Sequence, residues 1–162
     1  MTSVSLGASY LETRLKVLEL LRREHAYSDV VREAQEVVEL ALKGVLRVLG
    51  VEPPKIHDVG PLILEYRDRL PGAVQPDADR IAEASRWLRK EREFSFYGEV
   101  DLIPTEEYGV EEAERALADA RFVVGRARVV FASVRGDDEA SRRCRPQDCS
   151  DEKEDAADRR AK

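Results

Sequence analysis

The sequence predicts an all-α fold, an antiparallel up-and-down bundle of four to five helices. Apolar residues recur at steps of three and four along most of the chain, and this spacing is typical of one face of a helix. No segment alternates apolar and polar residues in the manner of a half-buried strand. The connection between the first two periodic segments is short, so these two helices are expected to run antiparallel, and one long loop is expected before the last helix.

The first two helices are expected over residues 9–25 and 29–49. Ser28 and Asp29 lie where the first pattern breaks, and they can cap the second helix. Gly50 then stands where glycine commonly ends a helix. The residues expected to face the core are Leu11, Leu15 and Leu18 in the first helix, and Val30, Ala34, Val37, Val38, Ala41, Leu42, Val45 and Leu49 in the second.

Three further helices complete the expected bundle. Two prolines enforce an extended loop, after which Asp58 can cap a short third helix that ends at Arg69. A fourth helix is expected over residues 77–97 and a fifth over residues 110–134. Their expected core residues are Ile81, Ala84 and Leu88 in the fourth, and Ala113, Leu117, Ala120, Val123, Val124, Ala127 and Val130 in the fifth.

Composition divides the chain into three parts. Residues 1–7 are expected to be flexible, and residues 8–134 to form the bundle. Residues 135–162 are mostly charged and have almost no large apolar side chains, so this tail is expected to be disordered. The alternative is a helix that forms on binding a partner.

Cys144 and Cys149 lie in the tail without a second pair of ligands, so neither a zinc site nor a disulfide is expected.

Charge and motifs narrow the possible function classes. The 162-residue chain is one domain long, and its net charge of −6 gives no overall basic field, so any nucleic-acid contact must use a local patch.

No apolar run approaches the roughly 20 residues of a membrane span. The first residues lack a signal-peptide pattern, so we expect a cytoplasmic protein. We expect no cofactor and no metal, because phosphate loops and paired-histidine motifs are absent. The absence of Asn beside abundant Glu and Arg is typical of heat-adapted proteins.

The predicted fourth helix concentrates basic residues near its end. Arg86, Arg89, Lys90 and Arg92 fall within about two helical turns. A solvated helix face explains them, because cations suit the negative end of the helix dipole. The alternative is a surface that binds RNA or a nucleotide through Arg86, Arg89 and Lys90. Trp87, the chain's single tryptophan, is expected in the core or in an interface.

Several segments together resemble the HEPN family of helical domains. They are the run AQEVVELALKGVLRVLGVEPPKIHDVGPLI from Ala34, the run REFSFYG from Arg92, and the run IPTEEYGVEEAERAL before and into the last helix. The all-helical plan and the length agree. The resemblance covers residues 8–134. It implies a helical bundle that dimerises and, in many members, a metal-independent ribonuclease whose composite site forms where two copies meet.

The resemblance also implies which residues act. The family's nucleases carry an arginine followed a few residues later by a histidine near a helix end. By position Arg92 matches the arginine, and Tyr97 stands where the histidine is expected. Arginine can stabilise the charge that develops on a phosphorane. A phenol is protonated at neutral pH, so it donates a hydrogen bond well and accepts a proton poorly. Tyr97 can still orient a phosphate.

Partners and alternatives follow from the same resemblance. We expect a homodimer, a nucleotidyltransferase antitoxin as partner, and RNA or a nucleotide as ligand. Three functions stay open: a toxin-like ribonuclease or RNA-binding protein, a non-catalytic module that binds a nucleotide, RNA or a partner protein, and a structural adaptor. His57 can replace the missing base, or it can form hydrogen bonds around the start of the third helix.

Overall fold

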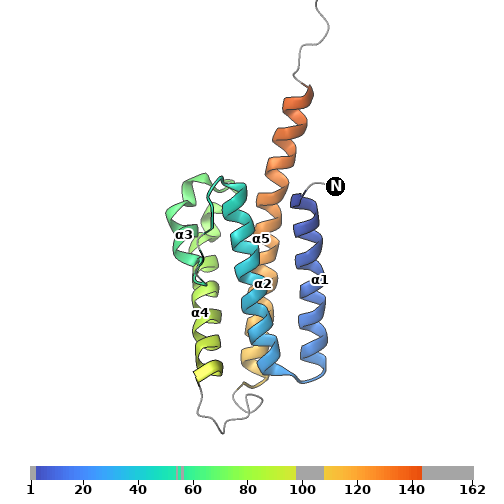
Figure 1. Ribbon diagram of the computed structural model, residues 1–162, viewed down its shortest axis with the longest axis vertical. Coiled ribbons are helices and arrows are strands. Elements are labelled where there is room, and N and C mark those ends of the chain that lie inside the picture. Colours follow the sequence, from blue (N-terminus) through green and yellow to red (C-terminus); the bar gives the residue numbers. More distant parts are fainter. Residues whose placement is uncertain (1–2, 54, 56, 98–107, 144–162) are drawn as a thin grey trace, which may run out of the picture.

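The computed structural model describes residues 3–53, 55, 57–97 and 108–143, with side chains for 7–53, 55, 57–90 and 108–134. The elements in chain order are α1 (Ser3–Arg23), α2 (Tyr27–Val48), α3 (Gly60–Glu65), the 3-10 turns η1 (Arg67–Arg69) and η2 (Gln75–Asp77), α4 (Ala78–Tyr97) and α5 (Val110–Arg143). Figure 1 shows the four long helices side by side, with α3 at one end of the bundle. The described part of the chain contains no strand. The predicted all-α bundle is confirmed.

Helix α2 is the centre of the bundle. It packs against α1, α4 and α5 along its length and also touches α3, and its contact with α5 is the most extensive. Every core residue predicted for the second, fourth and fifth helices is buried except Leu49, which is partly buried. In α1, Leu11 and Leu18 are buried and Leu15 is partly buried. None of the described helices is long and apolar enough to cross a membrane.

The two ends of the bundle differ from the expected boundaries. Helix α1 begins at Ser3, within the segment 1–7 that is predicted to be flexible. Helix α5 continues past the expected boundary at Val134 and ends at Arg143 (Figure 1). Extending an existing helix requires only propagation, because the costly nucleation step has already occurred within the bundle. Residues 144–162, with both cysteines, lie outside the described part.

The turn between α1 and α2 corrects the predicted cap. Helix α2 begins at Tyr27, so Ala26 is its N-cap and Ser28 and Asp29 lie inside the first turn. His25 instead adopts a left-handed conformation with φ 58°, and two backbone hydrogen bonds close α1: His25 N–H to Arg22 at 3.1 Å and Ala26 N–H to Leu21 at 3.0 Å. Ala26 has no polar side-chain atom, so no side-chain hydrogen bond caps α2 at this position. Asp29 lies in the first turn of α2 and pairs with Arg32 at 2.6 Å.

The end of α2 follows the prediction. Gly50 adopts φ 75°, and its N–H donates to the Arg47 carbonyl at 3.0 Å while the Val51 N–H donates to Leu46 at 2.9 Å. This pair of bonds is the Schellman arrangement, in which a left-handed glycine satisfies the last carbonyls of a helix. The third helix is shorter than expected, because α3 ends at Glu65 and the chain tightens into η1 before Leu70 and Pro71 end the element.

Three ion pairs fix how α1 and α5 lie against each other. Glu12 pairs with Arg128 at 2.6 Å, Glu19 with Arg121 at 2.6 Å, and Arg22 with Glu114 at 2.7 Å. The residue number on α1 rises from 12 to 22 while that on α5 falls from 128 to 114, so the helices are antiparallel. Exposed pairs contribute only about 0.2–1 kcal/mol each. Their main effect is on the alignment of the two helices.

Gly60 seats the start of α3 directly on α4. A Cβ atom at position 60 would lie 3.0 Å from the carbonyl oxygen of Ala82, 3.1 Å from its Cα and 3.3 Å from the Ser85 Cβ. The first two of these atoms belong to the backbone of a packed helix and cannot rotate away. The absence of a side chain at Gly60 therefore allows the loop before α3 to approach α4.

Gly60→Ala is expected to lower the free energy of unfolding by about 1–3 kcal/mol, the usual cost of overpacking a rigid core. Urea denaturation followed by circular dichroism measures the change. Gly72→Ala is the matched control, because Gly72 is exposed and has open space around it. That control is expected to change stability by less than about 1 kcal/mol. Equal midpoints for the two variants would contradict the close approach.

Candidate functional site

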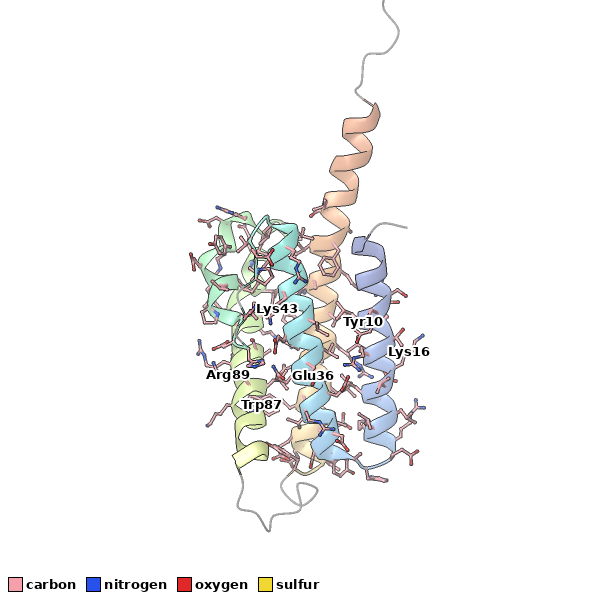
Figure 2. The ribbon with its side chains drawn as sticks, in the orientation of Figure 1. Tyr10, Lys16, Glu36, Lys43, Trp87 and Arg89 are labelled. Carbon is pink, nitrogen blue, oxygen red and sulfur yellow. The ribbon has the colours of Figure 1, made fainter. Side chains whose placement is uncertain are left out.

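A group of polar side chains connects α2, the loop before α3, and α4. We call it the α2–α4 cluster. Figure 2 labels two of its cations, Lys43 on α2 and Arg89 on α4. Its members are Gln35, Glu39 and Lys43 on α2, His57 and Asp58 in the loop, and Arg89 on α4.

Glu39 is the centre of the cluster. Its Oε1 accepts a hydrogen bond from Lys43 Nζ at 2.7 Å, and its Oε2 accepts from Gln35 Nε2 at 2.8 Å and lies 3.1 Å from His57 Nδ1. Burial raises the pKa of the Glu39 carboxyl, but hydrogen bonds from Lys43, Gln35 and His57 outweigh burial, and the net pKa lies below the ordinary 4.5. Glu39 is therefore ionised at neutral pH.

The charge of Glu39 determines the hydrogen-bonding state of His57. An ionised carboxylate only accepts hydrogen bonds, so the proton in the His57–Glu39 contact belongs to Nδ1 of the imidazole. In neutral His57 the other ring nitrogen, Nε2, then carries a lone pair. The His57 side chain is 70% exposed, whereas that of Glu39 is 14% exposed. A mostly buried anion thus holds a histidine at the surface.

Asp58 attaches the same loop to α4. Its Oδ1 accepts a hydrogen bond from the Gly60 N–H at 3.3 Å, and its Oδ2 lies 3.8 Å from Arg89 Nη1. The predicted N-cap position of Asp58 is wrong, because Val59 is the N-cap of α3 and makes no side-chain cap hydrogen bond. Asp58 lies one residue earlier and still accepts a hydrogen bond from the first N–H of the helix. Two successive loop residues, His57 and Asp58, therefore contact two different helices.

The predicted binding cations all lie on α4. Arg89 belongs to the α2–α4 cluster and is partly exposed, while Arg86 and Lys90 are exposed. Arg92 and Tyr97 lie in the last turns of the same helix, but their side chains are outside the described part of the structure. The Arg92–Tyr97 pair stays a prediction.

Trp87 packs between α4 and α5. Its ring is partly buried against the core, and the Arg115 guanidinium lies 4.2 Å from the ring centroid. Phe122 on α5 has a similar contact, with the Arg80 guanidinium 3.8 Å from its centroid. Burial raises the pKa of the neighbouring Asp119 carboxyl. The positive charges of Arg115 and Arg80 lower this pKa by less, so the net pKa lies above its ordinary value. Trp87 therefore takes part in packing inside the chain.

Two other kinds of candidate site, a metal site and a surface hollow, do not coincide with the α2–α4 cluster in the described part of the chain. Among the side chains that the structure describes, no group of three or more His, Cys, Asp or Glu residues is placed to hold a metal ion. A hollow of about 420 Å³ lies at the end of the bundle where α2 meets the loop after η1 and α5. Its lining residues, none of which belongs to the α2–α4 cluster, are Val48, Leu49, Arg69, Leu70, Pro71, Val130, Ser133 and Val134.

Comparison with known proteins identifies the family. A sequence model of the HEPN domain matches residues 12–130, which is most of the chain. The chain belongs to the HEPN domain family. Its fold is similar to the crystal structure of an archaeal HEPN homologue, with a TM-score of 0.59 and 21% sequence identity over 81% of this chain and 99% of that one. A search of curated proteins found no match.

The sequence interpretation of this HEPN domain missed Glu39 and Lys43. Gln35, Glu39 and Lys43 recur at four-residue steps along α2, so they form one polar stripe beside the buried face of the helix. That stripe is the signal that could have indicated a site. Its contact with His57, 18 residues after Glu39, depends on the fold.

Glu39→Gln is expected to lower the free energy of unfolding at pH 7 by about 1–2 kcal/mol, the range for hydrogen bonds to a charged group after partial screening by solvent. The pKa of Glu39 is lower in the folded than in the unfolded chain. Its stabilising contribution is therefore complete above about pH 4.5 and is lost as the pH falls through the folded-state pKa. Denaturation at several pH values should show the largest difference from wild type near neutrality.

Glu36→Gln is the control for that experiment. Glu36 lies one turn earlier on α2 and pairs with Arg14 at 3.3 Å, and its side chain is 40% exposed. Because Glu36 is exposed and Arg14 keeps its shorter ion pair with Glu33 at 2.8 Å, the loss of the Glu36 charge is expected to cost less than about 1 kcal/mol. An equal effect of both substitutions would show that Glu39 has no special place in the structure.

Proposed function

We propose that this HEPN protein is the toxin-like component of a toxin–antitoxin pair and a metal-independent endoribonuclease. The observation that carries the proposal is the series of cations on α4. Arg86, Arg89 and Lys90 lie within about one and a half turns of the helix that leads to Arg92 and Tyr97, on a chain whose net charge is −6. A local basic surface on an acidic protein is the pattern by which such a protein can hold a polyanion.

The proposed reaction is cleavage of RNA by its own 2′-hydroxyl. That hydroxyl attacks the neighbouring phosphorus, and the reaction needs a proton acceptor and a cation beside the developing phosphorane charge. Arg92 is permanently charged and can bind two phosphate oxygens at once, so it is the proposed cation. Tyr97 donates a hydrogen bond to the phosphate.

Two partners belong to the proposal. A second copy of the chain would place two α4 ends together and complete the site. A small nucleotidyltransferase would act as antitoxin, and the Tyr97 hydroxyl is a chemically reasonable acceptor for a nucleotide. The localisation that agrees with these partners is the cytoplasm.

The alternative is a non-catalytic module that binds RNA, a nucleotide or the partner protein through the same cations. The observation that favours it is Tyr97 itself, because a phenol at this position is a poor base. Salt-sensitive RNA binding without cleavage would support this alternative, and the logarithm of the binding constant would fall with the logarithm of salt by about 0.7 per phosphate contact.

Arg92→Ala is expected to abolish cleavage of unstructured RNA in the presence of a chelator, because the phosphorane loses its cation. The assay compares purified wild type and variant on a labelled oligonucleotide. Arg128→Ala removes the same charge from the contact between α1 and α5 and is expected to cleave like wild type. Cleavage by Arg92→Ala at the wild-type rate would refute the proposed role.

Tyr97→His is expected to raise the cleavage rate, because imidazole accepts and donates protons near neutral pH whereas a phenol does not. General acid–base catalysis contributes roughly 10²–10⁴-fold, which sets the upper range of the gain. Circular dichroism checks that the fold is retained. A folded variant with no gain would count against the interpretation that the proton acceptor of this reaction is missing at position 97.

A further inference from the structure

The α2–α4 cluster contains a histidine that the proposed reaction has not used. We infer that His57, held by the Glu39 carboxylate, is the proton acceptor for RNA cleavage, with Lys43 and Arg89 as neighbouring phosphate-binding cations. The inference rests on the proposed function. It assigns the base that Tyr97 cannot supply to a residue from another part of the chain.

The contact between Glu39 and His57 leaves Nε2 of the imidazole suited to accept a proton. Nδ1 donates to Glu39 Oε2 at 3.1 Å, so the lone pair of the neutral ring is on Nε2. The ring is 70% exposed and accessible to a substrate. Once Nε2 takes a proton, the adjacent carboxylate stabilises the imidazolium. A carboxylate behind a histidine has this effect in hydrolases of unrelated folds.

A purely structural role explains His57 less well. Glu39 already accepts hydrogen bonds from Lys43 at 2.7 Å and from Gln35 at 2.8 Å, so both of its oxygens are satisfied without the imidazole. The loop is independently attached by Asp58, which bonds to the Gly60 N–H and faces Arg89. An exposed ring also adds little apolar burial.

Two cations contact residues that adjoin the proposed base. Lys43 Nζ lies 2.7 Å from Glu39 Oε1, on the carboxylate oxygen opposite to the one that contacts His57. Arg89 faces Asp58, the residue next to His57, at 3.8 Å. Position 92 follows Arg89 by about one turn of α4, or roughly 5 Å along the helix axis. The backbone of residue 92 therefore lies about one turn beyond the residue that faces this loop, and in the proposal the phosphate binds between that turn and the loop.

The proposed step conserves atoms and charge. His57 Nε2 takes the proton of the 2′-hydroxyl as the 2′-oxygen bonds to phosphorus, and the bond from phosphorus to the 5′-oxygen breaks. The 5′-oxygen takes a proton from water, and the imidazolium returns one to water. RNA is the sole substrate consumed, and the products are a 2′,3′-cyclic phosphate and a 5′-hydroxyl end.

The test uses the full chain with His57→Ala and a labelled single-stranded RNA oligonucleotide. Cleavage is expected to fall by about 10²–10⁴-fold while RNA binding is unchanged, because only proton transfer is lost. Added imidazole is expected to restore part of the rate, and a residue that merely holds the loop would not respond in this way. His25→Asn is the matched control, since asparagine tolerates the positive φ of that position. Cleavage by His57→Ala at the wild-type rate would overturn the inference while leaving the proposed function intact, provided that Arg92→Ala is inactive.

Nitrogen-15 NMR of the histidine rings tests the same inference without activity. In the free protein at a pH where His57 is neutral, its proton is expected on Nδ1, and Glu39→Ala is expected to shift it toward Nε2. A proton found on Nε2 in the wild type would overturn the assignment of His57 as base. Wild-type protein that binds RNA but does not cleave it would remove both the proposed nuclease function and this inference.

Discussion

The contact between α2 and α5 is the constraint on which the rest of the structure depends. Both helices present mainly alanine, valine and leucine to the core, so their contact buries mostly apolar side chains. Gly44 on α2 makes room for the Phe131 ring on α5, since a Cβ at position 44 would lie 3.0 Å from that ring. Because α2 also touches α1, α3 and α4, its placement against α5 orients every other helix.

Helix α2 also carries a polar stripe that anchors the loop before α3. Gln35, Glu39 and Lys43 form a stripe beside the apolar faces, and the loop before α3 attaches to this stripe through His57. The close seating of Gly60 on α4 holds the other end of the loop. One helix therefore supplies both the core contact of the bundle and the anion at the centre of its polar cluster.

Sequence periodicity was sufficient to predict the helices and their buried faces. The spacing of apolar residues within one helix determines which of its faces is buried, so this signal can be read from neighbouring residues alone. Helix ends were predicted less well. Gly50 was predicted because a left-handed glycine is a local signal, whereas the start of α2 depended on His25 closing α1, which the residue type did not indicate. The approach of His57 to Glu39 and of Asp58 to Arg89 depends on how three elements pack, so no spacing rule could reveal either contact. Arg92 and Tyr97 came from family resemblance, and their roles stay predictions.

The position of Trp87 has a practical consequence. The indole lies where α4 and α5 meet, with a guanidinium over its face, and the sequence contains no other tryptophan. Tryptophan emission from the protein therefore originates at a single joint, on the helix that also carries Arg86 and Arg89. Any spectral change on mixing with an oligonucleotide or a second protein would report motion at that joint, with no dye attached.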